Sequence, residues 1–392
     1  MRFQSYFNTA IKIIELYDGA IPLSHFLKKY FSKNKKHGSK DRKFITHACY
    51  NYYRPGFALK DINIEERLKV AIFLCNSNAG EWDIIYDDNW IEHWNDQIRK
   101  RLFFIQSAYN FSVENIFPFY NEISEDIDKE SFALSHLIQP HVFLRIRNNH
   151  HDRVVNAFHQ HHIVFENIDT NCIAVDNSNR LEEIINIDEE AVIQDYSSQR
   201  IKEFLEVFKS EIQNPKSKIN MWDCCAGSGG KSILAYDILQ NIELTVSDIR
   251  SSIIHNLKKR FEKANIKNYK SFVADITNSQ LQVPNSAFDL IICDAPCTGS
   301  GTWSRTPEQL YFFQSKKIEE YSTLQKKIVS NAIKYLKQQG YFLYITCSVF
   351  KTENEDAVKF IQEKFQLTLI KTELLKGYNK KADTMFAALF KK

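Results

Sequence analysis

The sequence lacks the features that would place it among membrane, secreted or disulfide-stabilised proteins. None of its apolar runs approaches the about eighteen residues of a membrane-spanning helix, and its first residues lack the apolar core of a secretory signal. The eight cysteines follow no framework spacing, which indicates reduced thiols. With 44% hydrophobic and 25% charged residues, the composition is that of an ordinary globular protein. We therefore expect a monomeric cytoplasmic protein without a membrane partner, long enough at 392 residues for two or three domains.

Positive charge is concentrated near the start of the chain, although the net charge of +3 is too small to indicate a partner. Positions 28–43 hold eight Lys or Arg and one acid, Asp41. A solvated loop would explain this stretch, and so would a surface that contacts phosphates. In the second interpretation the candidate contacts are Lys35, Lys36, Lys40 and Arg42.

The hydrophobic pattern changes twice along the chain. In residues 1–130, apolar side chains recur every three or four positions, which predicts helices. Residues 131–195 include an alternating stretch at 142–147 and a short helical pattern, which predict a small α+β domain. The histidines of this region have no Cys or acid at ligand spacing, so we expect no metal site.

From 196 to 392, strands and helices alternate, which favours an α/β fold with a doubly wound, mostly parallel sheet. The predicted strands are 218–223, 243–248, 270–275, 288–293, 341–346, 367–371 and 385–390, and the predicted helices include 231–239, 316–336 and 354–364.

Two cysteines follow two of these strands and form the central observation. The strand at 288–293 leads into Asp-Ala-Pro-Cys-Thr-Gly, so that Asp294 and Cys297 open a loop. The strand at 341–346 leads directly into Cys347. Ligands of open α/β sheets bind at this edge, where parallel strands end. Two small apolar core residues are the alternative, as most free cysteines are.

A glycine-rich loop, Cys-Ala-Gly-Ser-Gly-Gly-Lys at 225–231, follows the strand at 218–223. Such glycines let backbone N–H groups approach a ligand at a helix N-terminus. Asp248 lies roughly twenty residues downstream, where an acid can bind both hydroxyls of a ribose, and Asp275 ends another predicted strand. An NTPase phosphate loop is the alternative, but it requires Gly where Cys225 stands. The pattern favours an adenosine cofactor without phosphates.

These motifs resemble those of the RNA (cytosine-5)-methyltransferases of the RsmB/NSUN type. The family's cofactor loop, Asp-x-Cys-Ala-Ala-Pro-Gly-Gly-Lys, corresponds to 223–231, with Gly227 and Ser228 in place of Ala-Pro. Asp-Ala-Pro-Cys at 294–297 and Thr-Cys-Ser at 346–348 match two further motifs, and Glu-Asn-Glu follows at 353–355.

The resemblance covers nearly the whole chain. The start is similar to the NusB-like domain of the bacterial ribosomal RNA enzymes, with Asp41, Arg42 and Arg54 at its landmarks. The small α+β domain at 131–195 is expected to have an RRM/ferredoxin-like fold. The resemblance thus implies a class I, Rossmann-like methyltransferase domain at 196–392, S-adenosylmethionine as cofactor, and single-stranded or loop RNA as substrate.

Roles follow from the resemblance residue by residue. Cys347 is implied as the nucleophile that adds to carbon 6 of cytosine, and Cys297 as the thiol that assists the later elimination. Asp294 is implied to bond the base at nitrogen 3 and to lie near the cofactor, with Lys231 as its electrostatic partner. The implied cofactor-binding set is Cys225, Ala226, Gly227, Ser228, Gly229, Gly230, Lys231, Asp248, Asp275 and Asp294. In the small domain, Arg145 and Arg147 are further candidate RNA contacts.

Three alternatives stay open at this point. DNA cytosine methyltransferases use the Pro-Cys thiol as nucleophile, which would exchange the roles of Cys297 and Cys347. A protein that only binds RNA would fit a decayed cofactor loop at Gly227 and Ser228. Transfer RNA is the third alternative, as substrate. The NusB-like start and the absence of a C-terminal extension favour small-subunit (16S) ribosomal RNA over it.

Overall fold

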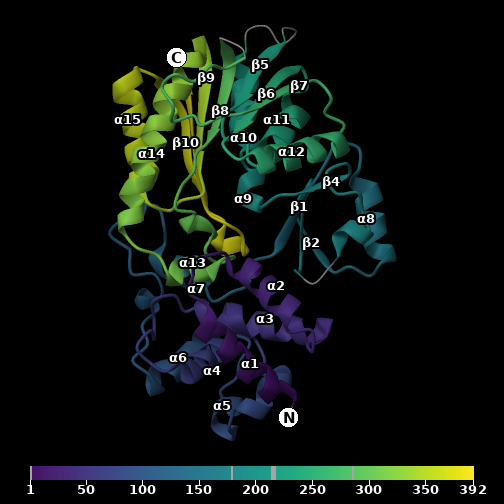
Figure 1. The fold of residues 1–392 in the computed structure, drawn as a ribbon, viewed down its shortest axis with the longest axis vertical. Helices are drawn as coiled ribbons and strands as arrows, with labels where there is room; N and C mark the ends of the chain where they lie inside the picture. The colour runs from purple at the N-terminus through teal and green to yellow at the C-terminus, as the bar shows by residue number, and fades with distance from the viewer. Residues whose placement is uncertain (1, 178–179, 213–217, 285–286) are drawn as a thin grey trace. The chain divides into compact units, whose positions relative to one another are not determined.

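The computed structural model describes residues 2–177, 180–212, 218–284 and 287–392 (Figure 1). The chain forms two compact units. The helical unit comprises Met1–Asn121, Ile127–Pro140 and Thr302–Ser315, and the sheet unit comprises Glu122–Asp126, His141–Gly301 and Lys316–Lys392. No helix of the described residues has the length and apolar character needed to cross a membrane.

The helical unit confirms the prediction of helices for the first part of the chain. Its first helix, α1 (Arg2–Leu16), buries Phe7, Ala10 and Ile14 along one face, as an amphipathic helix should. The others are α2 (Leu23–Lys33), α3 (Ser39–Tyr53), α4 (Ile64–Cys75), α5 (Asp88–Glu92), α6 (Ile98–Ala108), α7 (Lys129–Ser135) and α13 (Pro307–Tyr311).

A segment from the middle of the predicted methyltransferase domain, Thr302–Ser315, belongs to the helical unit. Fully buried Arg54 donates hydrogen bonds to the carbonyl oxygens of His136, Ile138 and Ser304, each at 3.0 Å. Glu308 accepts a hydrogen bond from the amide of Leu23. Contacts between distant parts of the chain therefore place this segment with the helical unit, whereas the sequence pattern assigned it to the domain at 196–392.

The sheet unit contains the predicted doubly wound sheet. Its strand order is β10-β11-β9-β8-β5-β6-β7, and of these seven strands β11 alone runs in the direction opposite to the others. The strands are β5 (Ile219–Asp223), β6 (Ile242–Asp248), β7 (Tyr269–Val273), β8 (Phe288–Asp294), β9 (Leu336–Thr346), β10 (Thr368–Leu375) and β11 (Met385–Lys391). All seven strands were expected, with small differences at their ends.

The largest difference concerns β9, which begins at Leu336 instead of position 341. The helix predicted for 316–336 accordingly ends earlier, as α14 (Lys316–Ala332). Leu336 pairs with Phe288, and the register shifts before Leu290 pairs with Tyr341. A bulge that includes Gln339, with φ of 63°, explains why the alternating pattern does not reveal the first part of the strand.

Helices cover both faces of this sheet. Helices α10 (Lys202–Glu211), α11 (Gly230–Leu239) and α12 (Ser251–Lys263) share an apolar core with the strands. Figure 1 shows α14 and α15 (Glu355–Phe365) on the opposite side. Parallel strands buried on both faces read as continuous apolar runs, which is why the sequence predicted them well.

The predicted small α+β domain is a four-stranded antiparallel sheet with the order β2-β3-β1-β4. Its elements are β1 (Val142–Ile146), α8 (His151–Gln160), β2 (Phe165–Asp169), β3 (Cys172–Val175) and β4 (Ala191–Ile193). It has a core of its own, which includes Leu144, Phe158 and Ile173. The division of the chain nevertheless groups it with the large sheet in one unit.

Candidate active site

The glycine-rich loop links β5 to α11, and two of its glycines are required by its conformation. Gly227 (φ +52°) donates its amide to Asp248 Oδ2 at 3.1 Å. Gly229 has φ of +85°, and a Cβ there would lie 2.7 Å from the Phe261 ring. A side chain at position 229 would therefore be disfavoured by the positive φ angle and would also clash with Phe261 of α12.

A pocket of about 500 Å³ opens beside this loop. Its wall is made by the ends of β5, β6 and β8, the segment after β7, and α14. The lining residues are Cys224, Cys225, Gly227, Asp248, Ile249, Arg250, Ala274, Asp275, Ile276, Thr277, Asp294, Ala295, Pro296, Cys297, Leu324, Ile328 and Cys347. The size is that of a small-molecule site, and the position is the strand edge where ligands of such sheets bind.

Two acids in the pocket wall suit hydroxyl or amine recognition. Burial raises the pKa of Asp248, but hydrogen bonds from the Arg250 side chain and from the amides of Arg250 and Gly227 outweigh it, so the pKa lies below its ordinary value. Asp275 accepts hydrogen bonds from Thr277, at 2.9 Å from the amide and 2.7 Å from the hydroxyl. Asp248 is thus a fixed carboxylate at the pocket wall.

The two cysteines singled out in the sequence meet at the edge of this pocket. Their Sγ atoms lie 3.2 Å apart, within hydrogen-bond distance for sulfur. They come together because β8 and β9 are parallel neighbours, so both strands end at the same edge. The hydrogen bond with Cys347, together with burial, raises the pKa of the Cys297 thiol well above its ordinary value. Cys297 therefore remains a protonated thiol.

Lys231 and Asp294 form an ion pair beside these thiols, with Nζ 2.7 Å from Oδ2. The lysine side chain is only 13% exposed. Burial alone would lower the pKa of Lys231, but Asp294 and the nearby Cys347 raise it above its ordinary value. The site thus holds a buried positive charge next to a carboxylate and a thiol.

Glu353 anchors both cysteine loops, and sequence reasoning gave it no role beyond its place in the Glu-Asn-Glu motif. The side chain is fully buried. It accepts hydrogen bonds from the amide and hydroxyl of Thr298, at 2.9 and 2.5 Å, and from the hydroxyl of Ser348. Gln325 of α14 donates to it at 2.9 Å. Thr298 follows Cys297 and Ser348 follows Cys347, so one carboxylate ties the two loops together.

The structure brings together only part of the predicted cofactor set. Of the described loop residues, Cys225 and Gly227 line the pocket, whereas Ala226, Gly229 and Gly230 do not. Ser228 does not line it either, and both its carbonyl and its hydroxyl accept hydrogen bonds from Arg260 at 3.0 Å. Lys231 is not part of the pocket lining, but its Nζ pairs with Asp294, which is.

The candidate RNA contacts divide into two groups. Lys35, Lys36 and Lys40 are exposed on the helical unit, and half-buried Arg42 donates to the carbonyl of His37. Arg145 and Arg147 are placed differently from the expectation. Both form ion pairs with Asp237 of α11, at 2.6 and 2.7 Å, and their side chains are 7% and 13% exposed.

The prediction that Arg145 and Arg147 contact RNA therefore stays a prediction. The two guanidinium groups share the single carboxylate of Asp237, and both side chains are mostly buried, which disfavours a phosphate contact. Arg147 also donates to the carbonyl of Ala264, so the pair attaches the small sheet to the helices of the large sheet within the same unit.

Comparison with known proteins places this site in a family context. Residues 211–389 match the family described as 16S rRNA methyltransferase RsmB/F. Ribosomal RNA small subunit methyltransferase B of Shewanella oneidensis is 29% identical over 144 residues, which is 37% of this chain and 33% of that protein. The probable methyltransferase B of Bacillus subtilis is 28% identical over 176 residues, 44% of this chain and 38% of its own. The matched parts thus span 33% and 38% of the lengths of these two relatives.

Solved structures share the fold at low sequence identity. The crystal structure of PH0851 has a TM-score of 0.71 with 18% identity, and covers 99% of this chain and 98% of its own. The structure of NSun6 from Pyrococcus horikoshii with SFG has a TM-score of 0.53 with 14% identity, and covers 65% of this chain and 91% of its own.

Proposed function

Because residues 211–389 match the family described as 16S rRNA methyltransferase RsmB/F, we propose that this protein methylates carbon 5 of a cytosine in RNA, with S-adenosylmethionine as methyl donor. The observation that carries the proposal is the 3.2 Å approach of the Cys297 and Cys347 sulfurs at the rim of a cofactor-sized pocket. Carbon 5 of cytosine is a poor nucleophile, and one thiol is needed to activate it and another to help release it.

The pocket fits the proposed methyl donor. The carboxylate of Asp248 suits the two ribose hydroxyls, and Asp275 lies on the same wall. S-adenosylmethionine supplies an electrophilic methyl group. The amide of Gly227 already bonds Asp248, which fixes the carboxylate before a ligand arrives. Gly227 and Ser228 stand where the family has Ala-Pro. The hydrogen bond to Asp248 remains possible there, because its donor is the backbone N–H of residue 227.

The chain's own residues supply the steps on cytosine. The thiolate of Cys347 adds to carbon 6, which makes carbon 5 an enamine carbon able to attack the methyl group. As the thiolate adds, nitrogen 3 of the base takes up a proton from solvent and donates it in a hydrogen bond to the carboxylate of Asp294, which favours addition; Lys231 holds this carboxylate at 2.7 Å. After methyl transfer a base removes the carbon 5 proton, the bond from Cys347 to carbon 6 breaks, and the thiolate is regenerated. Cys297 assists this last step.

The proposed substrate is small-subunit ribosomal RNA, the RNA named in the descriptions of the relatives. The target cytosine must leave the base stack for a thiol to reach carbon 6, so an unpaired cytosine is expected. Exposed Lys35, Lys36 and Lys40 offer phosphate contacts on the helical unit.

The test uses the purified full chain, methyl-labelled S-adenosylmethionine, and separate samples of unmodified 16S ribosomal RNA and transfer RNA. Digestion to nucleosides should give labelled 5-methylcytidine from the ribosomal RNA only, and none with Cys347→Ala. Label in transfer RNA alone would overturn the substrate assignment. Tight binding of RNA without cofactor binding or label would identify a protein that only binds RNA.

A further inference from the structure

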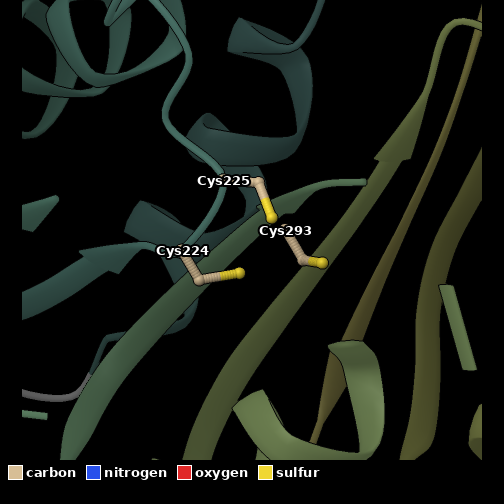
Figure 2. A group of neighbouring side chains, drawn as sticks. All are labelled: Cys224, Cys225 and Cys293. Atoms are coloured by element: carbon tan, nitrogen blue, oxygen red, sulfur yellow. The ribbon is translucent and has the colours of Figure 1, made fainter. Parts of the chain in front are cut away.

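Three thiols gather beside the pocket, and only Cys225 was expected to have a role there. Cys224 directly follows β5, Cys225 begins the glycine-rich loop, and Cys293 lies in the neighbouring strand β8 (Figure 2). The amide of Cys224 donates to the carbonyl of Ile292 at 2.9 Å, which sets the two segments side by side. The three Sγ atoms all lie within 4.8 Å of one another. In the part of the chain that the structure describes, this is the one group of three or more potential metal ligands at such spacing.

The donor set determines which ion would fit. Three sulfurs suit a thiophilic ion and exclude the hard cations Mg²⁺ and Ca²⁺, which require oxygen ligands. Zn–S bonds of about 2.3 Å place sulfurs about 3.8 Å apart in a tetrahedral site, so small side-chain movements would complete the geometry. Cys224 and Cys293 are fully buried, whereas Cys225 is half-buried and lines the pocket. The fourth ligand position would therefore be on the pocket side.

The surroundings favour a cation. Asp223 is buried next to the group, and its Oδ1 has no hydrogen-bond partner among the described residues.

We propose that Cys224, Cys225 and Cys293 bind one Zn²⁺ ion, with the fourth coordination position open to the pocket. Binding forms three Zn–S bonds and releases the thiol protons to solvent, without a change of oxidation state. The ion would sit in the wall that also contains Gly227 and Asp248. If the proposed function holds, zinc and S-adenosylmethionine compete for this pocket, and zinc inhibits methyl transfer.

The test measures Zn²⁺ binding to the reduced, metal-free full chain in the absence of cofactor and RNA, by calorimetry and by competition with a chromogenic chelator. We expect one ion per chain. Loss of an outer-shell partner typically weakens a metal site by about 10–100-fold, so loss of a ligand in Cys225→Ala or Cys293→Ala should cost about tenfold or more. Circular dichroism checks that each variant is folded. Cys225→Ala is the safer variant, because its side chain is half-buried.

Two controls separate this site from other thiols. Cys75→Ala removes another half-buried thiol, in the helical unit, and should keep full affinity. The double variant Cys297→Ala/Cys347→Ala removes the paired thiols and should also keep the ion. Unchanged binding in Cys225→Ala, or binding abolished only in the double variant, overturns the proposal.

Competition is measured separately, as S-adenosylmethionine affinity with and without zinc. The zinc site can thus stand while the proposed methyltransferase function fails, since zinc binding is measured without cofactor. If zinc binds at the three cysteines and cofactor affinity does not change, the competition is refuted.

Discussion

The sulfur atoms of Cys297 and Cys347 lie 3.2 Å apart although fifty positions separate the two residues in the sequence. Each cysteine lies beyond the carboxyl end of a strand, and the two strands are parallel neighbours. The contact, together with burial, raises the pKa of the Cys297 thiol, so this thiol keeps its proton beside the sulfur of Cys347.

Replacing Cys347 or Cys297 by Ala should stop the reaction at different steps. Cys347→Ala cannot form the bond to carbon 6 and should bind RNA only non-covalently. Cys297→Ala should still add to the base and transfer the methyl group, but stall before elimination. Its RNA should therefore appear as a labelled band that survives denaturing gel electrophoresis. A trapped band with Cys347→Ala and none with Cys297→Ala would reverse the assignment, as in the DNA enzymes.

Glu353→Gln should slow methyl transfer with little effect on cofactor binding. All four hydrogen bonds to this side chain come from donors, so an amide would place its NH₂ group against one of them. Hydrogen bonds to a charged group contribute about 1.5–3 kcal/mol, which corresponds to a rate loss of about 10–100-fold if the thiols lose their alignment.

The measurement for Glu353→Gln is the single-turnover rate together with calorimetry of S-adenosylmethionine binding. Glu355→Gln is the matched control, since the side chain of Glu355 accepts its hydrogen bond from Ser124, which belongs to neither cysteine loop. A normal rate in Glu353→Gln would show that the loops keep their alignment without this carboxylate.

Asp248→Ala should weaken cofactor binding by about 1.5–3 kcal/mol, the contribution of hydrogen bonds to a charged group. The change also frees Arg250, whose Nε lies 3.0 Å from Oδ1 of Asp248. Calorimetry with S-adenosylmethionine checks this result. Asp289→Ala removes a carboxylate that pairs with Lys337 away from this pocket and should leave the affinity unchanged. Equal dissociation constants for Asp248→Ala and the wild type would refute the cofactor placement.

Replacing Lys35, Lys36 and Lys40 by Ala should weaken RNA binding and flatten its salt dependence. The slope should fall by up to about one unit for each phosphate that the protein no longer neutralises. Binding is measured at several salt concentrations with a ribosomal RNA fragment. The control replaces Lys258, Lys259 and Lys263, exposed lysines of α12 that carry the same charge. If both triple variants bind RNA equally weakly, the stretch at 28–43 has no specific role.

Much of the sheet and its loops could be predicted because both depend on local pattern. Apolar runs report burial, and the residues that follow a strand lie at its end whatever its neighbours are. The sequence thus determined that Asp248, Asp294, Cys297 and Cys347 lie at or just beyond the ends of strands, and the motifs they belong to indicated the chemistry.

Only the tertiary structure decided which side chains meet. Arg145 and Arg147 have the same local pattern whether they face RNA or Asp237, and the fold pairs them with Asp237. The neighbouring positions of β5 and β8 bring Cys293 to Cys224 and Cys225. A local pattern indicates that a residue is buried, but it does not indicate which residue it contacts. The contacts depend on strand order and on packing between residues far apart in the chain.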